Sequence, residues 1–276
     1  MTGFRPALDG VHAVIVHRDS PRDLDACLAA IAGCCGVTVV DCDSRDGADA
    51  VALAHGAGLL RLHANPGYGA AANAGARRAP AETTVLVVAN ADVGIGPDGL
   101  AALARAIRSG AAAAGPVLPG RSPRRAVSLE SALAELSEHP AAAGPDPAGP
   151  GDPVDVLSGA LLALDIAAFR AIGGFDEGFV FYVEDDDLCR RMRAVGGRLV
   201  AVDGVRVEHV EGGASAALGH HRRRALLAAG RAKELGRHVG PSAAITYRRT
   251  ALVRALVTAN PLLALAALRP SAVRLP

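Results

Sequence analysis

The residues best suited to acid–base chemistry are four consecutive carboxylates, Glu184, Asp185, Asp186 and Asp187. Like charges at this spacing oppose full ionisation, so at least one of the four is expected to have a function. If residues 184–195 form a helix, Asp185 shares a face with the apolar residues that follow and points inward, whereas Asp186 points out to solvent. The alternative is an ordinary acidic first turn, because negative charge is favourable at a helix N-terminus. The cluster therefore predicts either a reactive carboxylate or a structural helix start.

A second polar group follows residues 37–40, an apolar segment that we expect to be a buried strand. Asp41 comes directly after this segment, and Ser44 and Asp46 lie in the next turn. The carboxylate of Asp41 can accept the imide hydrogen of a uracil or thymine base. For Ser44 and Asp46, the alternative is ordinary turn and helix-cap chemistry. This segment is a candidate site for a nucleotide base.

Residues 65–75 open a further expected helix with glycines and other small residues. Small side chains at Gly67 and its neighbours let the backbone approach a diphosphate or a sugar closely, and Asn65 and Asn73 supply hydrogen-bonding amides. Close packing of the helix on the sheet explains the glycines equally well. Both interpretations of this segment remain open.

Two polar residues, Asn90 and Asp92, follow the apolar segment 85–89. A carboxylate at such a strand end can bind Mg²⁺ or Mn²⁺, which are hard ions that prefer oxygen ligands and bridge to phosphates. The alternative is an ordinary turn or capping aspartate. Asp92 is thus the candidate metal ligand.

The elements that position these residues alternate between apolar strands and helices of amphipathic pattern. This alternation predicts a mainly parallel sheet covered by helices on both faces. Ligands of such sheets bind at the carboxyl ends of the strands, where the polar residues above fall. The expected strands are residues 11–16, 37–40, 59–62 and 83–89, and the expected helices are residues 21–32, 47–55 and 70–79.

The composition of the chain excludes several classes of protein. Its 276 residues, half of them apolar, are enough for one large α/β domain. A formal net charge of +1 gives no general attraction to nucleic acid, so no nucleic-acid partner is expected. The five cysteines show no C-x-x-C spacing, which argues against a disulfide framework and a structural zinc site and favours a reducing cytoplasm. No signal peptide is visible.

The chain is expected to divide at about residue 215. Residues 140–153 are rich in proline and glycine and predict a loop within one catalytic domain, residues 1–215, because strand-like sequence resumes at residues 154–164. Residues 216–276 predict a helical tail. Its basic helix begins near His220, and its apolar end, residues 255–268, is shorter than the roughly 20 residues that span a bilayer. Residues 220–268 either lie on an anionic membrane surface or pack on the core.

Four motifs in this order resemble those of the inverting family-2 glycosyltransferases, and among them the rhamnosyltransferase-like members. The motifs are V-V-D-x-x-S-x-D-G, a segment with spaced asparagines and glycines, an N-P-D or D-x-D triplet, and G-G-F-D-E-x-F-x-x-Y-x-E-D-x-D-L-x-x-R followed by a histidine. They correspond to residues 39–47, 65–75, 90–92 and 173–191, with His209 after the last. One motif alone is weak, but four at family-like spacing are specific. The resemblance covers roughly residues 11–240.

The resemblance implies a fold and a set of ligands. The fold is α/β of GT-A-like type, with a mainly parallel but mixed sheet flanked by helices and a C-terminal helical extension. The donor is a nucleoside-diphosphate sugar of the dTDP or UDP type, and the cofactor is Mg²⁺ or Mn²⁺. The donor-binding residues would be Asp41, Ser44, Asp46, Asn65, Gly67, Asn73 and Asn90.

The resemblance also implies individual roles. Asp41 matches the base-recognition position, Asp92 the metal ligand, His209 a later metal or diphosphate contact, and Asp185 the general base. Glu184 and Asp187 would tune and position Asp185, and Asp186 would be a solvated bystander. Gly159 and Ala160 match small residues beside the acceptor and donor sugars, and Asp176 and Glu177 match the turn before the acidic helix. The triplet begins with Asn90 rather than aspartate, which leaves one fewer anionic ligand.

The expected function is inverting transfer of a sugar, rhamnose being one candidate, to a hydroxyl of a glycan or a polyprenyl-linked acceptor. Such a reaction belongs to bacterial cell-wall or polysaccharide biosynthesis, in the cytoplasm or at the inner face of the membrane. A sugar nucleotidyltransferase is discounted because residues 16–24 lack its phosphate loop. The remaining alternative is a non-catalytic nucleotide-sugar or partner-binding module.

Overall fold

A mixed seven-stranded sheet lies at the centre of the computed structural model, which describes residues 8–118, 123–136, 154–209, 218–273 and 275. Four neighbouring strands are parallel and three more continue the sheet at one edge. From edge to edge the order is β3 (Gly58–Leu62), β2 (Gly36–Cys42), β1 (Val11–His17), β4 (Val85–Asn90), β7 (Leu161–Asp165), β6 (Ala113–Pro116) and β8 (Leu199–Val202). The expected mainly parallel, mixed sheet is confirmed.

The central strands consist almost entirely of apolar residues because helices cover both of their faces. The register aligns their carboxyl ends, since His17 of β1 pairs with Asp41 of β2 and Val16 pairs with Asn90 of β4. The polar residues that follow β1, β2 and β4 therefore meet at one edge of the sheet, as expected. Strand β7 runs antiparallel to β4, which places Leu161 beside Ala89 at this same edge.

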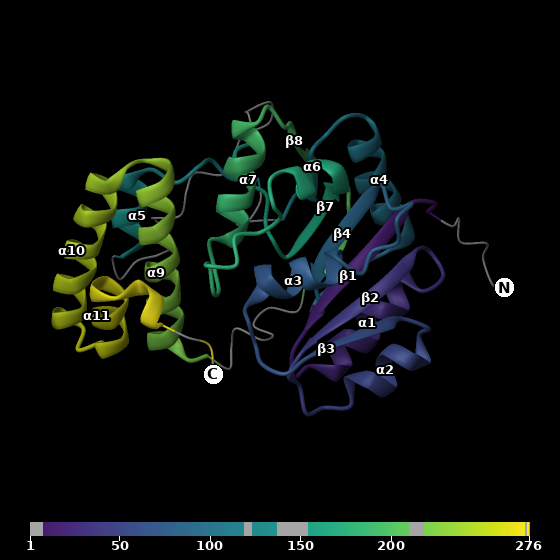
Figure 1. The fold of residues 1–276 in the computed structure, drawn as a ribbon, viewed down its shortest axis with the longest axis horizontal. Coiled ribbons are helices and arrows are strands. Elements are labelled where there is room, and N and C mark those ends of the chain that lie inside the picture. The colour runs from purple at the N-terminus through teal and green to yellow at the C-terminus, as the bar shows by residue number, and fades with distance from the viewer. Residues whose placement is uncertain (1–7, 119–122, 137–153, 210–217, 274, 276) are drawn as a thin grey trace.

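Two helical layers enclose the sheet (Figure 1). One layer consists of α1 (Pro21–Ile31), α2 (Ala48–Ala54) and α4 (Pro97–Arg108). The other consists of α3 (Tyr68–Ala76), α6 (Ile166–Ala171) and α7 (Glu184–Ala194). Each helix buries an apolar stripe; in α1 this stripe is Leu24, Cys27, Leu28 and Ile31, at helical spacing.

The glycines of α3 are explained by close packing. A Cβ atom on Gly75 would overlap the side chain of Val14 and would lie 2.8 Å from Cγ2 of Val40. A Cβ atom on Gly67, where φ is +98°, would overlap the carbonyl of Val180. Close packing therefore accounts for the absence of a side chain at these two positions, and contact of Gly67 with a donor stays a prediction.

A small second sheet stands beside the end of β4. It pairs β5 (Val93–Ile95) with β9 (Val207–His209) in antiparallel fashion, and Val93 lies opposite His209. Because Asp92 directly precedes β5, the backbone of His209 lies near this aspartate. The backbones of the two predicted metal-site residues, which are far apart in the sequence, thus lie close together in space.

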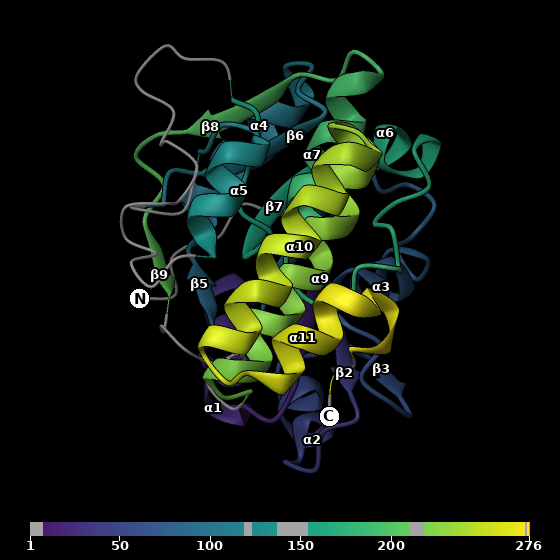
Figure 2. The same ribbon diagram turned by 90° about the vertical axis from the view of Figure 1, so that its left-hand side faces the viewer.

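The C-terminal helices form a separate layer with its own core (Figure 2). They are α9 (His220–His238), α10 (Pro241–Val257) and α11 (Pro261–Leu268), followed by the short helix η2 (Pro270–Ala272). Asn260 explains the break between α10 and α11, because its Oδ1 accepts a hydrogen bond from the N–H of Leu263 and caps α11. Among the described residues, no helix is both long and apolar enough to cross a membrane.

The helix α5 (Leu129–Glu135) belongs to this C-terminal layer although it comes from the middle of the chain. Val127, Ala132 and Leu136 pack in the same core as Leu235 and Tyr247. The predicted tail therefore has a partner that its own sequence did not indicate. Residues 140–153, the predicted loop, lie outside the described residues, and only residues 161–164 of the strand-like segment 154–164 fall in a strand.

Candidate active site

A polar cluster lies at the carboxyl ends of strands β1, β2 and β3, with Asp41 buried and Arg61 exposed. Oδ1 of Asp41 accepts a hydrogen bond from the N–H of Ser44 at 3.0 Å, and Oδ2 lies 3.0 Å from Nε of Arg61. His17 is also buried, with Nε2 at 2.9 Å from Oδ2 of Asp46. Two members of the cluster, His17 and Arg61, were not among the predicted site residues. The sequence does contain a signal for both residues. Each lies near the carboxyl end of a strand, β1 or β3, that pairs with β2, which carries Asp41.

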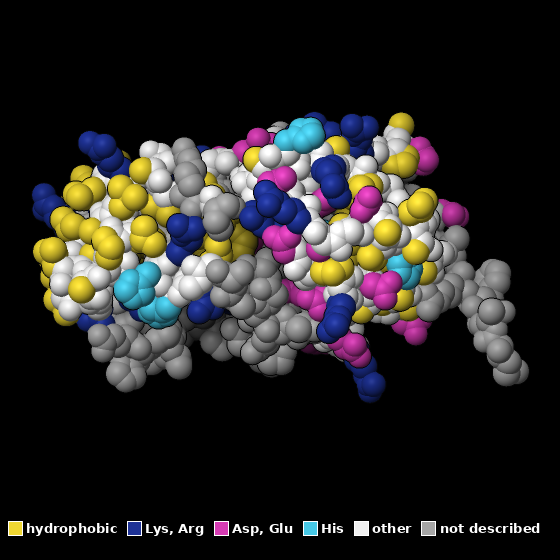
Figure 3. Space-filling model, turned by 90° about the horizontal axis from the view of Figure 1, so that it is seen from below, with side chains coloured by type: hydrophobic (Ala, Val, Ile, Leu, Met, Phe, Trp, Pro, Cys, Tyr) yellow, Lys and Arg dark blue, Asp and Glu magenta, His cyan; other side chains and the backbone are white. Residues whose placement is uncertain are grey.

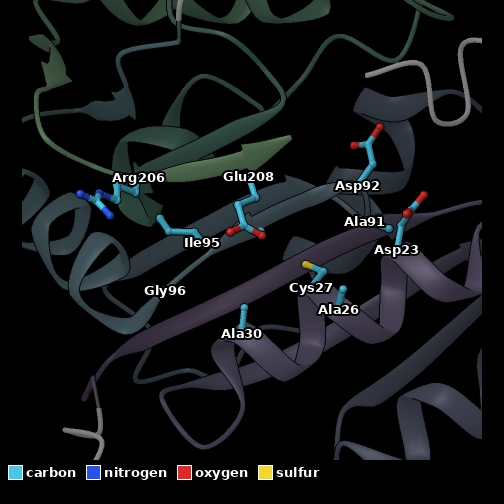
Figure 4. A pocket seen from close by; sticks show the side chains of 11 residues that line it. Asp23, Ala26, Cys27, Ala30, Ala91, Asp92, Ile95, Gly96, Arg206 and Glu208 are labelled. Carbon is cyan, nitrogen blue, oxygen red and sulfur yellow. The ribbon is translucent and has the colours of Figure 1, made fainter. Parts of the chain in front are cut away.

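A second polar group surrounds the end of β4. The N–H of Asn90 donates to the carbonyl of Ala160, which ties this strand end to the segment before β7. Asp92 and Glu208, a residue of β9, both line a pocket of about 320 Å³ between α1 and the small sheet. Asp23 and Asp92 lie towards one end of the pocket and Arg206 towards the other (Figure 4). This edge of the sheet therefore combines an open volume with acidic side chains.

Asp185 lies in the first turn of α7, beside Gly159. Its Oδ2 accepts a hydrogen bond from the N–H of Gly159 at 2.8 Å, and its Oδ1 accepts one from the N–H of Asp186 at 3.0 Å. The side chain is 18% exposed. Burial and the charge of Asp186 raise the pKa of Asp185, while Arg124 opposes the rise. A partly accessible carboxylate with a raised pKa is suited to accept a proton.

Asp186 is not solvated, so the prediction that it points out to solvent is wrong. It is only 1% exposed, and its two oxygens lie 2.8 Å from Nη2 of Arg124 and 2.7 Å from Nη1 of Arg231. Burial would raise the pKa of Asp186, but these cations hold it below its ordinary value. Helix α9 covers the side of α7 that the periodicity of α7 alone marks as outward.

Glu184 and Asp187 have different environments. Burial, together with the charge of Asp185, raises the pKa of Glu184 well above its ordinary value and favours the protonated form. Asp187 is fully buried, and its pKa is lowered because it accepts hydrogen bonds from Arg191, Arg237 and His238 at 2.7 to 2.9 Å. Asp186, rather than the predicted Asp187, is the carboxylate that raises the pKa of Asp185.

The pair of Asp187 and Arg191 secures the turn before α7. Arg191 also donates to the carbonyls of Ile172 and Gly174, at 3.0 and 2.8 Å. This explains why a carboxylate and an arginine four residues apart accompany the G-G-F-D turn in the motif. Asp187 therefore supports the position of α7.

Asn73 holds the other side of the same turn. Its Nδ2 donates to the carbonyl of Phe175 and to Oε1 of Glu177, and its Oδ1 accepts from the N–H of Phe175 at 2.9 Å. Asn65 likewise accepts from the N–H of Gly67. The amides of both asparagines are thus used within the protein, and their contact with a donor stays a prediction.

Two family models match the chain in succession. A model described as glycosyl transferase family 2 matches residues 13–142. A model described as the N-terminal domain of galactosyltransferase matches residues 141–212. No curated protein matches the chain.

Several solved structures share the fold. A structure of glucosyl-3-phosphoglycerate synthase from Mycobacterium tuberculosis with Mn²⁺, UDP and phosphoglyceric acid has a TM-score of 0.59 and 16% identity, over 83% of this chain and 78% of that one. The same synthase with Mg²⁺ and UDP has a TM-score of 0.58 and 16% identity, over 85% and 81%. A structure of GalNAc-T7 with UDP, GalNAc and Mn²⁺ has a TM-score of 0.53 and 16% identity, over 73% of this chain but only 44% of that one.

Identities this low show a shared fold and no more. The fold is the GT-A-like one: a mostly parallel mixed sheet flanked by helices, here with additional C-terminal helices. The two successive family matches cover the sheet and the helix that carries Asp185. Together, these matches and the fold support a family-2 glycosyltransferase.

Proposed function

We propose that the chain transfers a sugar from a nucleoside-diphosphate donor to an acceptor hydroxyl, with inversion at the anomeric carbon. The observation that carries the proposal is the environment of Asp185, a partly exposed carboxylate of raised pKa. It is linked through Gly159 and Ala160 to the strand end that precedes Asp92. The proposed proton acceptor is therefore connected by hydrogen bonds to the polar end of β4, where the donor would bind.

In the proposed reaction, the acceptor oxygen bonds to the anomeric carbon from the face opposite the diphosphate. The bond between that carbon and the diphosphate oxygen breaks, and its electron pair leaves with the diphosphate. The acceptor proton passes to the carboxylate of Asp185. The hydrogen bonds from the N–H groups of Gly159 and Asp186 keep this carboxylate in place during the transfer.

The donor base is assigned to the cluster around Asp41. A carboxylate has about four lone-pair positions, so Asp41 can accept an imide N–H besides its contacts with Ser44 and Arg61. The neighbours described above are complexes with UDP, which supports a uridine donor, and a dTDP donor has the same imide. Rhamnose is proposed only from the motif pattern.

The residues near β5 fit a divalent cation held jointly with substrate. Asp92 supplies a carboxylate and the backbone of His209 runs beside it, but the described residues contain no ready group of three metal-binding side chains. Mg²⁺ and Mn²⁺ commonly bind through one or two carboxylates and complete their shell with phosphate oxygens and water. When bound, such an ion offsets negative charge on the leaving diphosphate. Asp92 and His209 would hold it.

Donor binding is tested by thermal unfolding with UDP and dTDP sugars, with and without Mn²⁺. A donor at about 100 times its Kd stabilises the folded state by about 2.7 kcal/mol, a rise in Tm of roughly 5–10 °C. Asp92→Asn is expected to abolish the part of this rise that depends on Mn²⁺, and Asp98→Asn, an exposed aspartate on α4, to keep it.

The donor that stabilises most is then assayed for transfer or hydrolysis with Mn²⁺. A family-2 glycosyltransferase gives turnover, whereas a non-catalytic binding module gives stabilisation without turnover. An absence of stabilisation by every UDP and dTDP sugar would contradict the proposed function.

We also propose that the outward face of α10 contacts an anionic membrane surface, where a lipid-linked acceptor would be found. One side of α10 packs on the C-terminal core, but Val253 and Leu256 on the other side are 61% and 74% exposed. Apolar side chains gather over these helices (left in Figure 3). Residues 241–276 contain arginines and neither Asp nor Glu, which matches anionic lipid.

This membrane proposal predicts co-sedimentation with phosphatidylcholine vesicles that contain phosphatidylglycerol, and much weaker binding to phosphatidylcholine alone. The double variant Val253→Asp, Leu256→Asp is expected to stay in solution. Leu53→Asp is the matched control, since Leu53 is an 80% exposed leucine on the distant α2. If the wild-type protein does not bind the anionic vesicles, or if it self-associates through this face, the proposed membrane contact of α10 is refuted.

A further inference from the structure

A chain of buried ion pairs connects Asp185 with the C-terminal helices. It begins at Arg124, whose Nη2 lies 2.8 Å from Oδ1 of Asp186 and 3.8 Å from Oδ2 of Asp185. The backbone of Arg124 is fixed by two hydrogen bonds with Val156, each 3.0 Å long. Val156 precedes Gly159 by three residues, and Gly159 donates to Asp185. The backbone segment 156–159 therefore links Arg124 to Gly159, whose N–H donates to Asp185.

The chain continues to Arg231 on α9. Nη1 of this fully buried arginine lies 2.7 Å from Oδ2 of Asp186, and its Nε and Nη2 each donate to Glu135 of α5 at 3.0 Å. Arg231 also donates to Glu234, which lies 2.9 Å from Nε of Arg190 on α7. Asp186 is thus held between one arginine beside Asp185 and one from the C-terminal layer.

An ordinary acidic helix start needs no such arrangement. Carboxylates in a first turn are stabilised by the helix dipole and by water, whereas Asp186 is buried and forms ion pairs with two arginines. Arg124 lies nearer to Asp186 than to Asp185, so it forms its direct ion pair with the former. Asp185 is instead held by the backbone N–H groups of Gly159 and Asp186. The guanidinium of Arg124 lies near it, at 3.8 Å, but forms its closer ion pair with Asp186.

We propose that Arg124 and Asp186 are positioning residues for Asp185, and that Arg231 anchors them to the C-terminal helices. The inference rests on the proposed function in that Asp185 is taken as the base. It assigns a role in the reaction to the helices α5 and α9, which carry no residue at the donor edge of the sheet. The predicted bystander Asp186 becomes the link between the two parts of the molecule.

The two neighbours act on Asp185 with opposite sign. The positive charge of Arg124 favours the ionised form of Asp185, and the negative charge of Asp186 disfavours it. The ionisable groups around Asp185 come from α7, α3, α9 and the segment before α5, and they are Glu184, Asp186, Cys189, Tyr68, Arg231 and Arg124. Among the described residues, Arg124 lies 3.8 Å from Oδ2 of Asp185, and Asp186 donates its N–H to Oδ1 of Asp185, so these two charged residues are its immediate neighbours.

The test is a titration of the Asp185 carboxyl by carbon-13 NMR in aspartate-labelled protein, with the resonance assigned by its loss in Asp185→Asn. No donor or acceptor is required. Arg124→Gln is expected to raise the midpoint by about one pH unit. Arg124→Lys keeps the charge and is expected to restore most of the wild-type value. Asp186→Asn is expected to lower the midpoint. Arg198→Gln, an exposed arginine that donates to Ser109, is expected to leave it unchanged.

Equal midpoints in wild type, Arg124→Gln and Asp186→Asn would overturn the inference, and so would shifts of the same sign in both variants. A purely structural role would reduce stability without this pattern of opposite shifts. If Asp186→Asn fails to fold by circular dichroism, the comparison of Arg124→Gln with Arg124→Lys still decides the matter.

The same variants separate this inference from the proposed function. In an active enzyme, the acid limb of the pH profile of kcat/KM moves with the NMR midpoint, up for Arg124→Gln and down for Asp186→Asn. Shifts of the midpoint in a protein that transfers no sugar would leave the positioning of Asp185 intact and refute its role as a base. If the variants are active but neither the acid limb of kcat/KM nor the NMR midpoint of Asp185 moves, only the positioning role of Arg124 and Asp186 is refuted.

Discussion

Replacing Asp185 with asparagine is expected to reduce sugar transfer by roughly 10²–10⁴-fold, the usual contribution of a general base. The amide has nearly the same shape, and its oxygen can still accept the hydrogen bond from the N–H of Gly159. It cannot take a proton from the acceptor hydroxyl. Transfer is therefore lost at the chemical step, while the thermal shift caused by the donor is expected to persist.

The control for this variant is Asp165→Asn. Asp165 also begins a helix, and its Oδ1 caps α6 by accepting from the N–H of Ala168 at 2.7 Å. Asparagine caps helices about as well as aspartate, so both stability and transfer are expected to stay near wild type. Wild-type turnover in Asp185→Asn would remove Asp185 as the base. Loss of donor-induced stabilisation in that variant would assign it to binding instead.

Replacing Arg231 with methionine is expected to lower the free energy of unfolding by about 3–5 kcal/mol, as is typical when one partner of a buried ion pair is removed. Methionine approximates the volume of the arginine stem but leaves Asp186, Glu135 and Glu234 without their shared cation. Urea unfolding at neutral pH measures the loss. Arg249→Met, at an exposed arginine on α10, is expected to change stability by less than about 0.5 kcal/mol.

The contribution of Arg231 also depends on pH. Arg124 and Arg231 hold the pKa of Asp186 below its ordinary value of 3.8 despite its burial. The resulting stabilisation is present at neutral pH and is lost as the pH falls below that value towards the lower pKa of the folded state. The difference between wild type and Arg231→Met is therefore expected to shrink in acid. A constant difference across this range would mean that the arginine acts by packing alone.

Much of the sheet could be predicted from local sequence. Apolar strands such as β1, β2 and β4 are buried on both faces, so their sequences are continuous apolar runs ended by polar residues. Parallel pairing then brings those ends to one edge, which is why Asp41, Asn90 and Asp92 were identifiable. Short strands such as β6, with the sequence AAGP, have no such pattern and were not predicted.

The environment of the acidic cluster could not be predicted in the same way. Periodicity correctly indicated a helix, but the side of α7 that carries Asp186 is covered by α9, whose contact residue Arg231 is 45 residues away. The same limit applies to α5, which joins the C-terminal core because of contacts with Arg231 and Tyr247 rather than because of its own sequence pattern. Long-range burial decides the role of a charged residue, and a single segment does not reveal it.

The contacts of Arg231 also affect the order in which the molecule becomes complete during synthesis. The sheet and α7 leave the ribosome before α9. At that stage Glu135 and Asp186, 96 and 45 residues upstream of Arg231, do not yet have this arginine as a partner. Until Arg231 is present, Asp186 has Arg124 as its arginine partner, and the first turn of α7 is not covered by α9. In a nascent chain that ends before α9, all strands of the main sheet are present, but Asp186 lacks Arg231, one of its two arginine partners. The surroundings of Asp185 are thus complete only after the C-terminal layer has docked.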